Sequence, residues 1–267
     1  MNRSKVVIGI FVALILIVIT IVLLACTVFV VRDVSVESDV SSYLVDEDRI
    51  VESSGLVMGR SIISINKEKV KAAIERENPY VEVKGIRRVF PSKVIISATI
   101  RTGIMLVKSE DGSYYALIDS SMKILNLAPA EDTVLTSATV VSGLRFSMPD
   151  EGPLAAIGTE IAFTDAACGD VLREIAASAY DSELSGRRFF TFFREISFDT
   201  TDAIVACIKT NKGVSLVLDK SLTTSVYDQL YLCLFYYSSK DVVIDYTHGY
   251  IRFDRDVNAY CWKETLD

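Results

Sequence analysis

The amino-acid sequence predicts an α+β protein with a single N-terminal transmembrane helix, a βααββ domain, and a mixed β-sheet domain with flanking helices. Three observations predict this class. Residues 6–31 are uncharged and almost entirely apolar, residues 32–101 alternate between strand-like and helix-like patterns, and residues 102–256 are mainly strand-like. Residues 1–5 and 257–267 are left as short tails at the two ends.

Composition excludes two broad classes of protein. The 267 residues include 28 basic and 35 acidic side chains, so the formal net charge is −7. A nucleic-acid-binding protein usually has a basic footprint, and this chain has none overall. Half of the residues are hydrophobic, which is far too many for a disordered chain. A globular protein that binds no nucleic acid is therefore expected.

Residues 6–31 are long enough for a membrane span. As a helix they would extend about 39 Å, compared with roughly 30 Å for the hydrocarbon core of a bilayer. Arg3 and Lys5 precede this stretch, and the positive-inside rule places such a tail in the cytoplasm. The expected localisation is therefore the cell membrane, as a single-pass protein with an extracytoplasmic bulk.

Cys26 provides an alternative interpretation. Leu23-Leu24-Ala25-Cys26 resembles a lipoprotein box, so the chain could instead be an extracytoplasmic lipoprotein or adhesion module lipidated at that cysteine. A cleaved signal peptide would need a shorter apolar stretch. Four further cysteines are widely spaced and show no zinc-ligand spacing, so whether they form disulfides stays open; they are Cys168, Cys207, Cys233 and Cys261.

The region 32–101 reads as strand, helix, helix, strand, strand. Alternation around Val34 indicates the first strand. Asp46 and Asn66 are good N-caps for helices over residues 47–54 and 67–77. Pro79 prevents the second helix from continuing, and two alternating strands follow at residues 81–89 and 93–101.

A basic cluster lies on the last two of these strands and consists of Lys84, Arg87, Arg88 and Lys93. Basic clusters bind acidic partners or anionic headgroups, and they also occur on ordinary solvated strand faces. Both interpretations stay open for this cluster.

The region 102–256 begins with a hairpin, residues 104–108 and 114–118, whose turn contains Asp111-Gly112. Helices are expected at residues 165–184 and 222–237, with strands between them at residues 196–199, 203–209 and 214–218. A final hairpin is expected from residues 242–246 and 250–254. The apolar helix 222–237 should pack against the sheet.

Nothing in the sequence indicates catalysis. The single histidine, His248, precedes Gly249 in an expected turn, where residues usually have a structural role. No nucleophile elbow, phosphate loop or HExxH motif is present. We therefore expect no enzymatic activity, no cofactor and no metal.

Several motifs of the first outer domain resemble those of a known family. They are Ser54-Gly55-Leu56, Gly59, the apolar run 62–65, Asn78-Pro79-Tyr80-Val81 and Arg88-Val89-Phe90-Pro91. This pattern resembles the POTRA domain of the FtsQ/DivIB cell-division family. The second domain carries weaker matches, including Gly112–Asp119 and the "Val-Ile-Asp" at residues 243–245.

The resemblance implies a non-catalytic scaffold at the division septum. Its expected partners are FtsL-type and DivIC/FtsB-type bitopic septal proteins and, in addition, a septal peptidoglycan synthase. In the family the final strands offer an open edge to a partner strand. The matching residues here are Tyr250, Ile251, Arg252 and Phe253, paired with a strand containing Val243 and Asp245.

Overall fold

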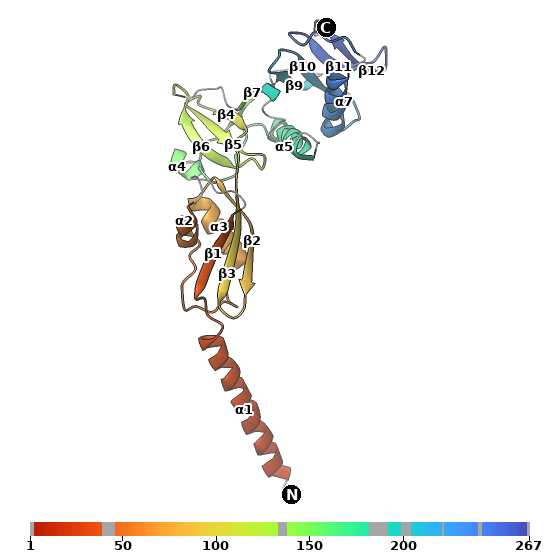
Figure 1. The fold of residues 1–267 in the computed structure, drawn as a ribbon. Coiled ribbons are helices and arrows are strands. Elements are labelled where there is room, and N and C mark those ends of the chain that lie inside the picture. Colours follow the sequence, from red (N-terminus) through yellow and green to blue (C-terminus); the bar gives the residue numbers. More distant parts are fainter. Residues whose placement is uncertain are drawn as a thin grey trace. The chain divides into compact units, whose positions relative to one another are not determined.

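The computed structural model describes residues 3–38, 46–132, 138–181, 192–198, 204–220, 222–239 and 242–265. The chain separates into two compact units, Met1–Arg101 and Thr102–Asp267. Helix α1 covers Arg3–Thr27 at the start of the first unit (Figure 1). The side chain of Cys26, the proposed lipidation site, lies outside the described residues.

The predicted membrane anchor is overturned. Across the described residues, no helix combines the length and the apolarity that a membrane crossing requires. The predicted transmembrane helix and the predicted single-pass cell-membrane localisation are therefore corrected. The α+β class stands.

The first unit has the predicted order of strand, two helices and two strands. Its elements are β1 Asp33–Ser38, α2 Glu47–Ser53, α3 Lys67–Glu77, β2 Val81–Val89 and β3 Lys93–Ile100. Strand β3 lies in the centre of the sheet, parallel to β1 and antiparallel to β2. Both helices pack on this sheet (Figure 1).

Capping side chains start both helices where the sequence predicts. The Asp46 carboxylate accepts hydrogen bonds from the first turn of α2, and the Asn66 side chain accepts one from the backbone N–H of Lys69 at 3.1 Å. Helix α2 buries Ile50 and α3 buries Ile74, both with no exposed surface. These side chains meet the inward-facing valines and isoleucines of β2 and β3, so the unit has its own hydrophobic core.

The second unit is built on one large mixed sheet. Its elements are β4 Met105–Ser109, β5 Tyr114–Ile118, β6 Ile124–Pro129, β7 Thr139–Phe146, α4 Pro153–Ala156, α5 Ala166–Asp181, β8 Phe193–Ser197, β9 Ile204–Thr210, β10 Ser215–Asp219, α7 Val226–Ser238, β11 Tyr250–Asp254 and β12 Ala259–Lys263. The strand order is β12-β11-β10-β9-β8-β7-β4-β5-β6. The predicted first hairpin is confirmed as β4 and β5.

Helix α7 covers the end of this sheet that contains β10, β11 and β12, and it also contacts α5 (Figure 1). The Gln229 amide of α7 bonds the backbone of Asp219 twice, accepting from its N–H at 2.8 Å and donating to its carbonyl at 3.1 Å. Cys233 and Leu230 of α7 are buried against the sheet. The predicted packing of this helix on the sheet is therefore confirmed.

The predicted final hairpin is wrong. Residues 242–249 form no strand, and β11 pairs instead with β10 in parallel and with β12 in antiparallel. The Asp245 carboxylate accepts hydrogen bonds from the backbone N–H and the hydroxyl of Thr247, at 2.8 and 2.6 Å. This local turn takes the place of a strand ladder, as Asp and Thr side chains favour.

Candidate partner-binding edge

Strand β12 ends the sheet on the side nearest α7. In the described part of the chain, β12 has a strand partner only in β11, with Tyr250 opposite Lys263 and Phe253 opposite Tyr260. The residues predicted to form the edge, Tyr250 to Phe253, therefore lie one strand further in. A strand at the end of a sheet presents backbone groups that another strand can pair with.

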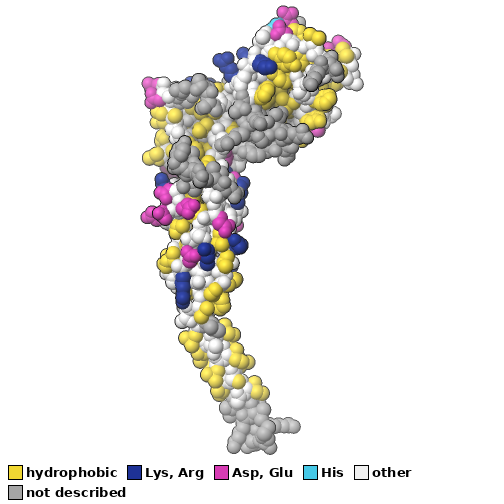
Figure 2. All heavy atoms as spheres, viewed as in Figure 1, with side chains coloured by type: hydrophobic (Ala, Val, Ile, Leu, Met, Phe, Trp, Pro, Cys, Tyr) yellow, Lys and Arg dark blue, Asp and Glu magenta, His cyan; other side chains and the backbone are white. Residues whose placement is uncertain are grey.

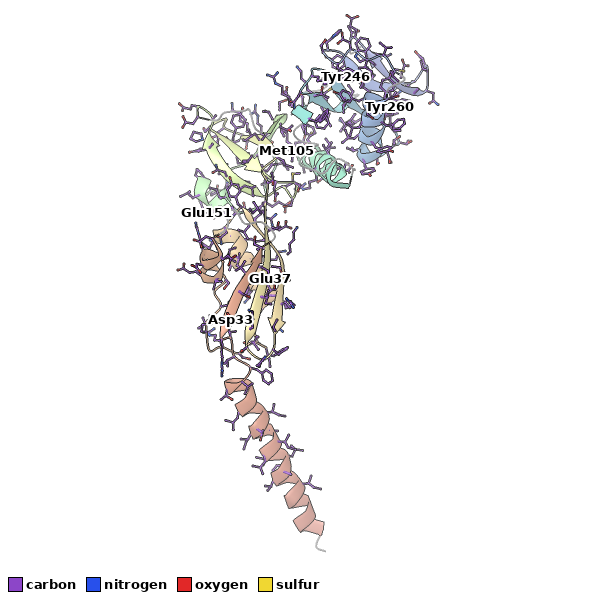
Figure 3. All side chains as sticks on the ribbon, in the orientation of Figure 1. Asp33, Glu37, Met105, Glu151, Tyr246 and Tyr260 are labelled. Carbon is purple, nitrogen blue, oxygen red and sulfur yellow. The ribbon has the colours of Figure 1, made fainter. Side chains whose placement is uncertain are left out.

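The backbone of Trp262 shows which β12 groups face outward. Its N–H donates to the Tyr236 hydroxyl of α7 at 3.2 Å, and not to β11. Along a strand, residues two apart direct their backbone groups to the same side. Tyr260 therefore also turns its N–H and carbonyl away from β11, toward the open side of the sheet. Figure 3 labels Tyr260 in this part of the second unit.

Side-chain contacts hold Trp262 in place. The indole N–H donates to the carbonyl of His248 at 3.1 Å, and the two rings meet edge to face with centroids 5.7 Å apart. Gly249 makes this close approach possible, because a Cβ there would lie 2.6 Å from the Lys263 carbonyl oxygen and 2.7 Å from the indole nitrogen. The turn before β11 is thus packed directly on β12.

An ion pair links the two final strands. Lys263 Nζ lies 2.7 Å from a carboxylate oxygen of Asp254. This contact with the Lys263 ammonium, together with the backbone N–H of Asp256, holds the pKa of Asp254 below its usual value. Asn258 adopts a left-handed conformation, φ 53°, in the turn between the strands.

Burial divides the predicted edge residues into two groups. Ile251 has no exposed surface and belongs to the core under α7, whereas Arg252 and Phe253 are partly exposed. Val243 is 97% exposed and Asp245 lies in the turn described above, where hydrogen bonds from Thr247 lower the pKa of its carboxyl. The structure therefore keeps Tyr250 to Phe253 together on β11 and leaves Val243 and Asp245 outside any strand.

The predicted basic cluster of the first unit does not converge on one point. Lys84 pairs with Glu82 at 2.7 Å, Arg87 with Glu37 at 3.5 Å and Lys93 with Asp33 at 3.1 Å, while a guanidinium nitrogen of Arg88 donates to the carbonyl of Ile65. Asp33 and Glu37 both lie on β1 (Figure 3). Figure 2 shows acidic and basic side chains interspersed on this unit. Three of the four positive charges of the cluster are therefore balanced locally.

Sequence reasoning missed the main residues of the edge. Tyr260 and Trp262 lie in the segment assigned to a tail, and Tyr236 was seen only as part of an apolar helix. The signal was present, because Ala259–Lys263 is rich in strand-favouring residues and follows an Asn that suits a left-handed turn.

The polar side chains of the His248 turn interact with one another. His248 Nδ1 lies 3.3 Å from Asp245 and 3.2 Å from the Thr247 hydroxyl, but that hydroxyl also donates to Asp245 at 2.6 Å. Over the described ranges, no group of His, Cys, Asp and Glu side chains has an arrangement suited to a metal ion.

Comparison with known proteins matches the first unit. Residues 31–99 match a family model described as "POTRA domain, FtsQ-type". The matched range begins just before β1 and ends one residue before the end of β3, so it covers all five elements of the βααββ arrangement except Ile100. No curated protein matches the chain.

Proposed function

We propose that this chain, which its FtsQ-type POTRA domain assigns to the FtsQ/DivIB cell-division family, is a non-catalytic scaffold of the bacterial divisome. The observation that carries the proposal is the match of residues 31–99 to the FtsQ-type domain. Proteins with this domain take part in divisome protein–protein interactions and are generally non-catalytic. FtsL-type and DivIC/FtsB-type septal proteins are the proposed partners, together with a septal peptidoglycan synthase.

Strand addition at β12 is the proposed mode of contact. The open side of β12 and the outward backbone of Tyr260 support it, because an added strand gains main-chain hydrogen bonds from such an edge. Behind β12, the residues Tyr250 to Phe253 of β11 would hold the edge in place. The Asp245 turn lies beside the same edge through the contact of His248 with Trp262.

Depletion of the protein in its own cells tests the scaffold role. We expect depleted cells to elongate without dividing, and division to return when the wild-type chain is expressed again. Cell length and septum counts measure the result. Normal division after verified depletion would show that the chain is not a divisome scaffold.

Proline at Tyr260 tests the strand edge. Tyr260→Pro removes an outward N–H from β12 and leaves the N–H groups that face β11 in place, so binding of FtsL-type and DivIC/FtsB-type proteins should weaken about tenfold. Affinity is measured by co-purification and titration with those proteins.

The control is Leu127→Pro on β6, at the other end of the sheet. The backbone N–H of Leu127 bonds the Asn126 side chain at 2.9 Å, so this proline also removes no ladder bond to β5. Thermal unfolding shows whether either variant is misfolded. Equal partner affinity for folded Tyr260→Pro and wild type would reject the edge without affecting the depletion result.

A further inference from the structure

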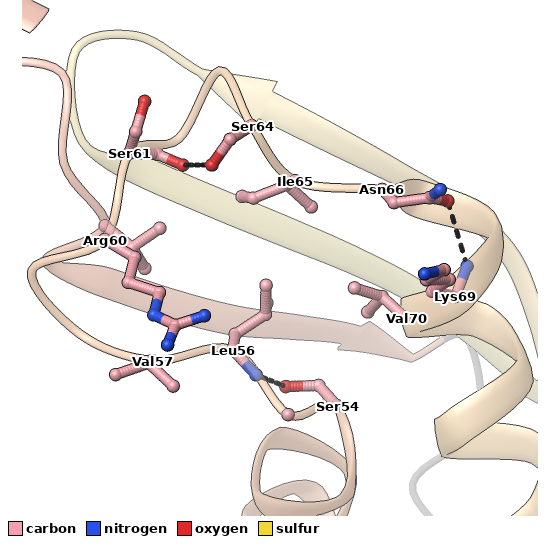
Figure 4. Close-up of a pocket in the computed structure, with 12 residues that line it drawn as sticks. Ser54, Leu56, Val57, Arg60, Ser61, Ser64, Ile65, Asn66, Lys69 and Val70 are labelled. Atoms are coloured by element: carbon pink, nitrogen blue, oxygen red, sulfur yellow. Dashed lines mark hydrogen bonds between the residues drawn. The ribbon is translucent and has the colours of Figure 1, made fainter.

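The first unit contains a groove that the strand-edge contact does not use. It lies between the segment after α2, residues 54–57, and the segment that leads into α3, residues 60–66 (Figure 4). We call it the α2–α3 groove. Its volume is about 280 Å³. The Ser-Gly-Leu motif of the POTRA domain, residues 54–56, forms part of its wall.

Hydrogen bonds of backbone and side chains fix both walls of the α2–α3 groove. The chain before β1 pairs with the segment beside it, since Val31 donates to the carbonyl of Arg60 at 2.8 Å and accepts from Gly59 at 2.8 Å. The Ser54 hydroxyl accepts from the N–H of Leu56 at 3.2 Å (Figure 4). Arg88 holds the opposite wall by donating to the carbonyl of Ile65. The groove is therefore formed before any ligand binds.

The lining combines apolar walls with basic ends. Val31 and Val70 are buried, and Leu56 and Ile65 are partly exposed on facing walls. Figure 4 shows the Arg60 and Lys69 side chains at opposite ends of the groove, and both are exposed. An occupant therefore meets an apolar surface between two positive charges.

Arg60 and Lys69 differ from the basic cluster on the neighbouring strands. Lys84, Arg87 and Lys93 each have a carboxylate within 4.0 Å, whereas neither Arg60 nor Lys69 forms an ion pair with any described residue. No acidic residue lines the groove. Its charge is thus available to a ligand, whereas three of the four charges of the cluster already have a carboxylate partner.

We propose that the α2–α3 groove binds an acidic linear peptide of a partner protein. Carboxylates of the peptide would pair with Arg60 and Lys69, and an aliphatic side chain between them would pack against Leu56 and Ile65. A simple anion would leave the apolar walls uncovered, so charge and shape together favour a peptide with both kinds of side chain. The site shares no residue with β12, so the two contacts can succeed or fail separately.

Selection from a library of random linear peptides, displayed and panned on the full chain, tests this inference. We expect enriched peptides to carry Asp or Glu on both sides of an aliphatic residue. In fluorescence-anisotropy titrations of an enriched peptide, the double substitution Arg60→Gln with Lys69→Gln should weaken binding about tenfold. Raising the salt concentration should weaken binding to the wild type as well.

The matched control is Lys84→Gln with Arg87→Gln, which removes the same charge from the same unit but leaves the groove intact. Val57→Asp adds a second probe, because Val57 is exposed on the wall and a carboxylate there would repel an acidic peptide. Thermal unfolding confirms that each variant is folded.

Three results would overturn the inference. One is a panning experiment that enriches no peptide, and another is enrichment of peptides without acidic residues. The third is an enriched peptide that binds the Arg60→Gln, Lys69→Gln protein as tightly as it binds the control. Self-association that is lost in the same double variant would identify a second copy of this chain as the occupant and would also overturn it.

Discussion

At the scale of single residues, close packing around Gly249 sets the position of the strand edge. Its φ of 85° lies in the left-handed region, and its Cα faces the backbone of Lys263 and the ring of Trp262. Gly112 has a similar φ of 79°, but a Cβ at Gly112 would first meet the flexible end of the Lys108 side chain, at 3.6 Å. Substitutions at these two glycines therefore separate the cost of the left-handed backbone conformation from the cost of close contact with neighbouring atoms.

We expect Gly249→Ala to lower the free energy of unfolding by about 2 kcal/mol more than Gly112→Ala. Both substitutions strain the backbone, but only the methyl group at position 249 must displace backbone and indole atoms. Denaturant unfolding of the two variants measures the difference. If the two variants lose the same stability, the tight contact between the turn and β12 is not as described.

At the scale of secondary-structure elements, one buried amide ties α7 to the sheet. Gln229 is 3% exposed and satisfies both the N–H and the carbonyl of Asp219 on β10. The Tyr236 hydroxyl of α7 also accepts a hydrogen bond from the backbone N–H of Trp262 on β12. The position of this helix on the sheet therefore affects the strand edge. Buried polar groups of this kind are costly to leave without their partner.

Gln229→Leu should lower the free energy of unfolding by about 2 kcal/mol, because leucine cannot replace the two hydrogen bonds to Asp219. The control on the same helix is Tyr231→Leu, which changes a side chain that is 57% exposed and should cost less than about 0.5 kcal/mol. Thermal and denaturant unfolding compare the two. A Gln229→Leu protein as stable as the control would contradict a structural role for this amide.

At the scale of the whole molecule, local sequence signals predict the first unit well. Asp46 and Asn66 start α2 and α3 where expected, and the apolar alternation of residues 94–100 identifies the central strand. These features depend on residues close together in the chain, which is the range over which caps and periodicity carry information.

In the second unit, which strands pair with one another could not be predicted from such local signals. Alternation identifies β11 as a strand, but it does not say that β10 lies beside it in parallel or that β12 follows it. Residues 242–244 look like the start of a strand because they are apolar, yet the hydrogen bonds that Asp245 accepts from Thr247 favour a turn. The basic ends of the α2–α3 groove were missed because Arg60 and Lys69 belong to separate segments of the chain, and only the fold places them on one groove.

The membrane-span prediction for the N-terminal segment is corrected by the structure. Hydropathy alone predicted a membrane span over residues 6–31, but the described helix does not meet the requirement for one. The class of the fold survived this correction because it rests on the other two regions.

The position of β12 in the chain also bears on biosynthesis. Strand β12 is the last described strand to leave the ribosome, and it completes the sheet against β11. Translation proceeds from the N-terminus, so a nascent chain that stops before residue 259 would expose β11, with Ile251 and Phe253, in place of the native edge. The proposed docking strand would thus exist only in chains whose synthesis has passed residue 263.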